Sequence, residues 1–464
     1  MRRRSRRVAG TSLLRRIRVA PALQARSYRR FLQRGYVMTA PPEVLILGAG
    51  VAGLTAARDL TAAGARVLVL EARDRLGGRV MTHHTPDGPV ELGAEFVHGA
   101  VEETLSVARE AALLLRETDR AAPRVAAADR GTTDFFSAMD VVLAHASETG
   151  PDESFQHLVD RVDAAADIKA QCLALVEGYH AADPARISVR SLLKNTAADE
   201  RPGANRQFRF VGGYDGLVTA IFQRVDPTLC DVRLNTVATA VSWGHKRAVV
   251  RTSTGEELAA PQLIVTVPLG VLKAGAIEFS PRLADKEDAL GRLEMGDAER
   301  VSLCLASDAW LAQDRFPPGG FLLTGEPPFP AWWVSRPAPL PVVTGWAGGR
   351  NARALGQLAG AAARVDAAVA ALAAALGVEA RRLRSDLRGG FTHDWLADPF
   401  ARGAYSYAGV GGSEAGAKLA VPIDGTLFFA GEATESDGQN GTVHGAIASG
   451  RRAAKQVLAR ETQS

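Results

Sequence analysis

Three glycines and one acid near the start of the chain have the spacing of a dinucleotide site. Gly48, Gly50 and Gly53 directly follow the apolar run at 44–47, and Glu71 ends the next apolar run. We predict a strand, a tight glycine turn and a helix, in which the turn lets backbone approach a diphosphate. The helix N-terminus would attract the diphosphate with free N–H groups and partial positive charge. Glu71 can accept hydrogen bonds from both hydroxyls of an adenosine ribose.

A second loop follows Glu71 at once. Arg73, Gly78 and Arg79 belong to the run EARDRLGGR at 71–79, which brings a glycine pair and several cations directly after the strand. A nicotinamide enzyme would normally continue into another strand–helix unit. Here the glycine pair supplies more backbone, and Arg79 a cation, where the phosphates would lie. The alternative interpretation is a surface turn with solvated arginines.

The run at 71–79 resembles the E-x-x-x-R-x-G-G-R pattern of the flavin-dependent amine oxidase superfamily and matches it in full. The run GAEFVHG at 93–99 is similar to that of polyamine oxidases, more than to those of monoamine or amino-acid oxidases. Similar runs recur along the chain, among them VPLGVL at 267–272, WLADPFARGAYSY at 395–407 and FFAGEAT at 428–434. The resemblance spans residues 44–450 and implies bound FAD.

The resemblance also implies which further residues contact the FAD. Ala404 stands where monoamine oxidases carry the cysteine that bonds the flavin, so we expect a noncovalent cofactor. A helix that begins near Thr442 would point its N-terminus at the flavin and stabilise the reduced cofactor. The implied contacts beyond residue 79 are Gly93, Ala94, Val237, Pro268, Trp395, Gly431, Glu432, Thr442 and Val443.

The resemblance also implies which residues contact the substrate. Tyr405 would form one wall of an aromatic cage that orients an amine. Thr442 takes the place of the second wall, usually aromatic in monoamine oxidases, so we expect a wider cage that accepts long or secondary amines. His98 could bind a cation or relay protons, and Glu95 could attract a second amine. The alternatives are a structural histidine and a surface acid.

Arg300 departs from the family pattern. Most relatives carry a lysine at this position, which holds a water at the flavin N5. Arginine stays protonated and cannot act as a base, although it can still hold a water. We assign catalytic roles to Arg300, His98, Tyr405 and Trp395, and leave open whether molecular oxygen or another acceptor takes the electrons.

The charge of the chain is divided unevenly. Of its 55 basic and 51 acidic residues, twelve arginines and no acid lie in residues 1–42, which leaves the remaining chain at about −8. The overall charge of +4 therefore belongs to the leader, and we expect no nucleic-acid partner. We predict a disordered leader and a cytoplasmic protein. The alternatives are organelle targeting or export through that leader.

Cysteine usage and hydropathy exclude several other classes of protein. The three cysteines are scattered, which favours a reducing compartment and no disulfide framework. No Cys/His pair has zinc spacing, so we expect no metal. No uncharged apolar window reaches 18 residues, so we expect no membrane span.

The order of the motifs predicts an α/β fold in which a discontinuous Rossmann-like FAD-binding domain receives an inserted α+β substrate domain. Helical patterns occur near 101–117, 135–147, 154–162 and 164–180, in and just before the first insertion. We predict a leader at 1–42, FAD-binding segments at 43–110, 206–278 and 395–464, and substrate segments at 111–205 and 279–394.

From these residues we expect oxidation of a polyamine-like or secondary amine by hydride transfer to FAD, giving an imine or aldehyde and hydrogen peroxide. The alternatives are an amino-acid oxidase or another flavin dehydrogenase or desaturase on the same scaffold, and a silent flavoprotein that binds a partner. An amino-acid oxidase needs a cation for the substrate carboxylate, and the motifs offer none beyond Arg300.

Overall fold

The computed structural model describes residues 40–118, 124–125, 135–147, 149–307, 316, 321–335 and 341–461. Residues 1–39, nearly all of the predicted leader, lie outside the described residues. In the described parts of the chain, no helix combines the length and the apolar composition that crossing a membrane requires.

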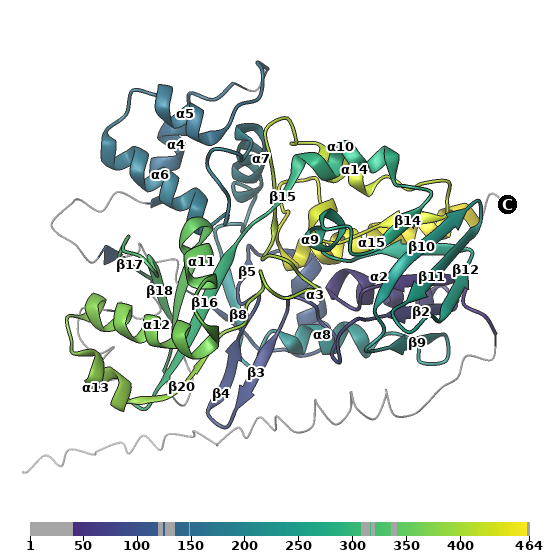
Figure 1. Ribbon diagram of the computed structural model, residues 1–464, viewed down its shortest axis with the longest axis horizontal. Helices are drawn as coiled ribbons and strands as arrows, with labels where there is room; N and C mark the ends of the chain where they lie inside the picture. Colours follow the sequence, from purple (N-terminus) through teal and green to yellow (C-terminus); the bar gives the residue numbers. More distant parts are fainter. Residues whose placement is uncertain are drawn as a thin grey trace, which may run out of the picture.

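A five-stranded parallel sheet forms the core of one half of the molecule, on the right in Figure 1. Alternate residues of its strands pack on opposite faces: Val44 and Ile46 join one buried cluster, and Leu45 and Leu47 join another. Both faces are covered, which is why the strands at 44–47, 67–70 and 427–429 are apolar throughout. The strands, in sheet order, are β22 (Leu427–Phe429), β13 (Gln262–Val265), β1 (Val44–Leu47), β2 (Val67–Leu70) and β9 (Cys230–Arg233).

Helices cover one face of this sheet, and a smaller sheet covers the other. Two of the helices approach closely: a Cβ at Gly450 would lie 2.3 Å from the carbonyl oxygen of Ala52. The fold is therefore α/β with a Rossmann-like sheet. The helices are α2 (Val51–Ala62), α3 (Glu102–Glu110), α8 (Asp215–Phe222) and α15 (Val443–Glu461). The second sheet has the order β12 (Glu257–Ala260), β11 (Arg247–Thr252), β10 (Ala238–Gly244), β14 (Glu278–Ser280).

A six-stranded sheet dominates the other half of the molecule, at the left in Figure 1. The helix α12 packs its apolar stripe against this sheet through Val369 and Leu372. The strands, in sheet order, are β20 (Leu387–Phe391), β16 (Ala298–Leu305), β19 (Val342–Gly348), β18 (Ala331–Ser335), β17 (Phe321–Leu323) and β7 (Arg124–Val125). The accompanying helices are α11 (Gly349–Gly356), α12 (Gly360–Leu376) and α13 (Ala380–Ser385).

A helical group lies above that sheet in Figure 1, and short strands connect the two halves. The helices are α4 (Phe135–Leu143), α5 (Phe155–Arg161), α6 (Ala166–Gly178) and α7 (Val189–Asp199). One small sheet has the order β5 (Val97–His98), β8 (Gln207–Phe210), β6 (Leu115–Glu117). The remaining elements are β3 (Thr82–Thr85), β4 (Gly88–Glu91), α9 (Leu269–Lys273), α10 (Ala284–Arg292), β15 (Leu293–Met295), β21 (Ser406–Ala408), α14 (Ala415–Ala420) and the 3-10 turn η1 (Glu432–Thr434).

Two local predictions differ from the structure. The helix expected at 101–117 ends at Glu110, because the chain turns through a positive φ of 51° at Ala112 and residues 115–117 then pair with β8. The predicted boundary at 278/279 falls inside β14, which pairs with β10. Residues just beyond that boundary, such as Ala289 of α10, join the cluster beneath the parallel sheet.

Candidate active site

One cavity of about 770 Å³ brings together nearly all the residues that the sequence marks out. It starts where β1 and β2 end and extends to β16, β17 and β18 of the six-stranded sheet. Gly53 is the one marked residue that does not line it. The marked residues that do are Gly48, Gly50, Glu71, Arg73, Gly78, Arg79, Gly93, Ala94, Glu95, His98, Val237, Pro268, Arg300, Trp395, Tyr405, Gly431, Glu432, Thr442 and Val443.

The glycine turn and the following loop are both held by the Glu71 carboxylate. Its two oxygens accept hydrogen bonds from the backbone N–H groups of Ala49, at 2.8 Å, and Arg73, at 2.9 Å. Gly53 packs against the turn so closely that a Cβ would lie 2.0 Å from the carbonyl oxygen of Gly48. The buried acid therefore fixes the backbone that surrounds the N-terminus of α2.

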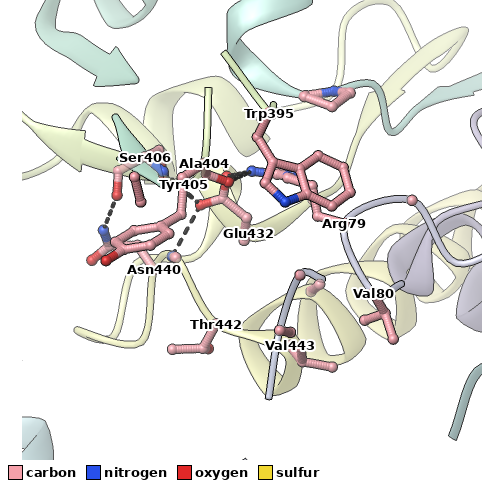
Figure 2. Close-up of a pocket in the computed structure, with 18 of the residues that line it drawn as sticks. Arg79, Val80, Trp395, Ala404, Tyr405, Ser406, Glu432, Asn440, Thr442 and Val443 are labelled. Atoms are coloured by element: carbon pink, nitrogen blue, oxygen red, sulfur yellow. Dashed lines mark hydrogen bonds and ion pairs between the residues drawn. The ribbon is translucent and has the colours of Figure 1, made fainter. Parts of the chain in front are cut away.

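Arginines of the second loop tie this region to the end of the chain. Arg73 forms an ion pair of 2.7 Å with Asp398. Arg79 donates to the Glu432 carboxylate and to the carbonyl oxygen of Ala404, each at 2.8 Å (Figure 2). Segments that lie more than three hundred residues apart in the sequence therefore close around one cavity.

Glu432 also sets the start of α15. Its second oxygen accepts from the Ser406 hydroxyl at 2.6 Å and from the N–H of Gly441 at 3.0 Å (Figure 2). Thr442 caps the helix, because its hydroxyl oxygen accepts the N–H of Gly445 at 3.0 Å. The N-terminus of a 19-residue helix is thus held at the wall of the cavity.

Backbone and one indole ring form a flat wall in the middle of the cavity. A Cβ at Gly93 would lie 2.0 Å from the carbonyl oxygen of Arg79 and 3.2 Å from the Trp395 ring. The Trp395 indole N–H donates to the carbonyl oxygen of Leu92 at 2.8 Å, which fixes the ring. Only glycine fits at position 93, and the resulting wall suits a planar group.

Glu95 is buried, not a surface acid, and its carboxylate has four partners. One oxygen accepts from Arg300 at 2.6 Å and from the Trp333 indole at 3.0 Å. The other accepts from the Ser335 hydroxyl at 2.9 Å and lies 3.0 Å from Nε of Arg209. Burial opposes ionisation, but the charges of Arg209 and Arg300 outweigh it and lower the pKa of Glu95. The carboxylate is therefore ionised and committed to this cluster.

Arg300 is fixed by the same cluster, on β16. Its second terminal nitrogen donates to the carbonyl oxygen of Gly93 at 2.7 Å, and its Nε is buried without a hydrogen-bond partner. Sequence reasoning missed Arg209, Trp333 and Ser335, which belong to no recognisable motif. The position of this arginine between two phenylalanines, at 208 and 210, is the one signal that could have pointed to Arg209.

Aromatic residues just after the end of α6 complete the far end of the cavity. The Tyr405 hydroxyl donates to the carbonyl oxygen of Tyr179 at 2.7 Å, which holds the Tyr405 ring in place. The Tyr179 ring meets His98 edge-on, with ring centroids 5.9 Å apart. Burial lowers the pKa of His180, another lining residue, to about 4. Tyr179 and His180 were not singled out from the sequence.

These features fit an FAD molecule. Glu71, the glycine turn at the start of α2 and the Gly77–Gly78 loop lie at one end of the cavity, and the wall of Gly93 and Trp395 lies further along it. Gly50 and Gly77 pair directly as an isolated bridge, so the two glycine-rich loops are adjacent. A dinucleotide with a planar ring system fits this order of features, with its phosphates at the glycine-rich loops and its ring at the flat wall.

The chain matches the family of flavin containing amine oxidoreductases over residues 51–160 and 144–458, and it belongs to that family. It is similar to polyamine oxidase 4 of Oryza sativa subsp. japonica, with 27% identity over 457 residues that cover 90% of this chain and 89% of that protein.

Solved structures share the fold. A double mutant of putrescine oxidase superposes with a TM-score of 0.74 at 22% identity, covering 90% of this chain and 99% of the other. Cyclohexylamine oxidase from Brevibacterium oxydans IH-35A superposes with a TM-score of 0.76 at 21% identity, covering 92% of this chain and 100% of the other. The protein is therefore an FAD-dependent amine oxidoreductase, close to the polyamine oxidases, that acts on a small-molecule amine and passes electrons to an acceptor. Ala404 offers no atom for a covalent bond, so the FAD is held noncovalently.

Proposed function

We propose that the protein oxidises the C–H bond next to an amine nitrogen and uses molecular oxygen as the acceptor. Amine, oxygen and water would give an aldehyde or ketone, a shorter amine or ammonia, and hydrogen peroxide, with an imine formed first and then hydrolysed. The bound flavin supplies the hydride acceptor for this reaction. The observation that supports the proposal most strongly is that one cavity joins the dinucleotide end, at Glu71, to an aromatic end, at Tyr405.

The chain's own residues would contribute orientation. Tyr405, held by its bond to Tyr179, would limit the positions of the amine, and the wall of Gly93 and Trp395 would fix the ring that faces it. Holding both reactants removes much of the entropic cost of their meeting. The N-terminus of α15, which is held at the cavity wall, would favour negative charge there. A cytoplasmic location stays a prediction.

Anaerobic mixing of the purified protein with a panel of amines tests the proposal. Loss of the visible flavin absorbance with amines, followed by peroxide on admission of oxygen, is the expected result. Bleaching by amino acids alone would favour an amino-acid oxidase. Bound FAD that no amine or amino acid bleaches would favour a silent flavoprotein.

The rate of flavin reduction should rise with pH. Only a neutral amine can release hydride, and a simple alkylamine has a pKa of about 10. The neutral fraction, and with it the reductive kcat/KM, should increase about tenfold per pH unit well below that pKa. His180 is already neutral above its pKa of about 4, so it should not titrate in this range. Stopped-flow measurement between about pH 6 and 9 checks this, and a flat profile would contradict amine oxidation.

Replacing Arg300 with lysine should speed reoxidation by oxygen. Lysine is the usual family residue at this position and can give up its proton more readily than arginine. We expect a gain of about tenfold, a fraction of what a well-placed proton-transfer group contributes. The measurement is double-mixing stopped flow, with Arg350→Lys as an exposed control. If Arg300→Lys leaves the rate of reoxidation by oxygen unchanged, residue 300 has no role in that step.

A further inference from the structure

The cluster around Glu95 carries more positive than negative charge. Two arginines, Arg209 and Arg300, face a single carboxylate in a region where the side chains of Glu95 and Arg300 are each 4% exposed. A buried charge is screened weakly by solvent, so the surplus cation acts on any second charge that enters nearby. Glu91, close enough to feel the Glu95 charge, does not offset it, because burial raises its pKa to about 8.

The other carboxylates that line the described cavity have different positions and partners. Glu71 holds the glycine turn, and Glu432 pairs with Arg79. Asp199, at the end of α7, is exposed, and a pair between solvent-exposed charges contributes little. Each buried carboxylate among the described lining residues is therefore already engaged, so none of them beside the aromatic end is available to an ammonium group.

Aromatic rings surround the same cluster. The Phe96 ring lies 5.5 Å from Trp333 and 5.7 Å from Phe321, centroid to centroid, and Arg209 stacks over Phe96 at 4.4 Å. Trp346 lies 6.0 Å from Trp333. Burial of apolar substrate groups against this wall would be favourable, whereas polar substrate groups would find few hydrogen-bond partners there.

Building on the proposed amine oxidation, we propose that the cavity selects amines with a single amino group and an apolar body. Arg209 and Arg300 are the specificity-determining residues, because their surplus charge disfavours a second ammonium group. The polyamine-like substrate expected from the sequence is then a poor one.

The same geometry disfavours amino acids. Both terminal nitrogens of Arg300 are already engaged, by Glu95 and by the carbonyl oxygen of Gly93. Arg209 donates to the carbonyl oxygen of Val334 at 3.0 Å and lies behind Glu95. Neither guanidinium offers the free two-pronged face that recognises a carboxylate.

Two matched pairs of compounds test the selectivity on the wild-type holoenzyme. Pentylamine and 1,4-diaminobutane differ by a methyl group in place of an ammonium group. Phenethylamine and phenylalanine differ by one carboxylate. Anaerobic stopped flow gives the limiting rate and apparent Kd for each. We expect the monoamine to be preferred by about tenfold or more in each pair, which corresponds to about 1.4 kcal/mol.

Equilibrium binding gives a second readout that does not require turnover. Calorimetric titration with inert quaternary ammonium ions, one singly and one doubly charged, should show the same preference for the single charge. Preferential use of the diamine, together with tighter binding of the doubly charged ion, would overturn the inference while leaving amine oxidation intact. Failure of every amine to reduce the flavin would instead overturn the proposed function.

Variants of Arg209 test whether its surplus charge causes the preference for monoamines. Arg209→Met leaves Glu95 paired with Arg300 and removes the surplus charge, so the preference for pentylamine should fall by about tenfold. Arg209→Lys keeps the charge and should keep the preference. Arg116→Gln is the matched control, because Arg116 is the exposed cross-strand partner of Arg209. An unchanged preference in an FAD-loaded Arg209→Met variant would overturn this assignment. If that variant does not fold, the wild-type pairs still decide the selectivity.

Discussion

Replacing Glu71 with alanine should give a protein that purifies without its yellow cofactor. Glu71 is 4% exposed and accepts the N–H groups of Ala49 and Arg73, so its loss releases both loops that would hold the diphosphate. Hydrogen bonds to a charged group contribute about 1.5–3 kcal/mol each, so losing two should weaken FAD binding by about 100-fold or more. The measurement is the flavin-to-protein absorbance ratio, followed by titration of the apoprotein with FAD.

The control for Glu71→Ala is Glu43→Ala. Glu43 lies at the start of the same sheet and also accepts a backbone N–H, that of Arg66 at 2.8 Å, but its side chain is 37% exposed. We expect Glu43→Ala to retain the cofactor. A Glu71→Ala protein with a full complement of FAD would contradict the role assigned to this acid.

The sequence predicted the first strand–turn–helix–strand unit well because its determinants are local. A strand, a glycine turn, a helix and a second strand follow one another within 44–71, and the pairing of β1 with β2 needs only this stretch of chain. The positions of Trp395 and Glu432 at the cavity could be predicted only through the family resemblance, since their partners Leu92 and Arg79 are more than three hundred residues away.

The environment of Glu95 could not be predicted. The surface position considered as an alternative was wrong, because β18 and β8 bring Trp333 and Arg209 onto an acid that lies between β4 and β5. Such contacts depend on how two sheets pack, and no local pattern encodes that. The helix expected at 101–117 failed for a related reason: residues 115–117 pair with β8, and this long-range pairing outweighs local helix preference.

Replacing Glu95 with leucine should strongly destabilise the protein. The change leaves Arg209 and Arg300 facing each other without their shared anion, and it removes the acceptor of the Trp333 indole and the Ser335 hydroxyl. Breaking a buried ion pair from one side typically costs about 3–5 kcal/mol. The measurement is the urea midpoint of the FAD-loaded protein, compared as a midpoint because a chain of this size need not unfold in two states.

The structure provides a control and a partial reversal for this change. Glu117 forms an exposed pair with Arg206, and Glu117→Leu should leave the midpoint unchanged because such pairs contribute little. Adding Arg209→Met to Glu95→Leu removes one of the two unpaired cations and should recover part of the lost urea midpoint. If the two sites were independent, the effects of the two substitutions would simply add. A Glu95→Leu midpoint equal to that of the wild type would mean that the two arginines reach solvent, and the fixed charge near the substrate would then be absent as well.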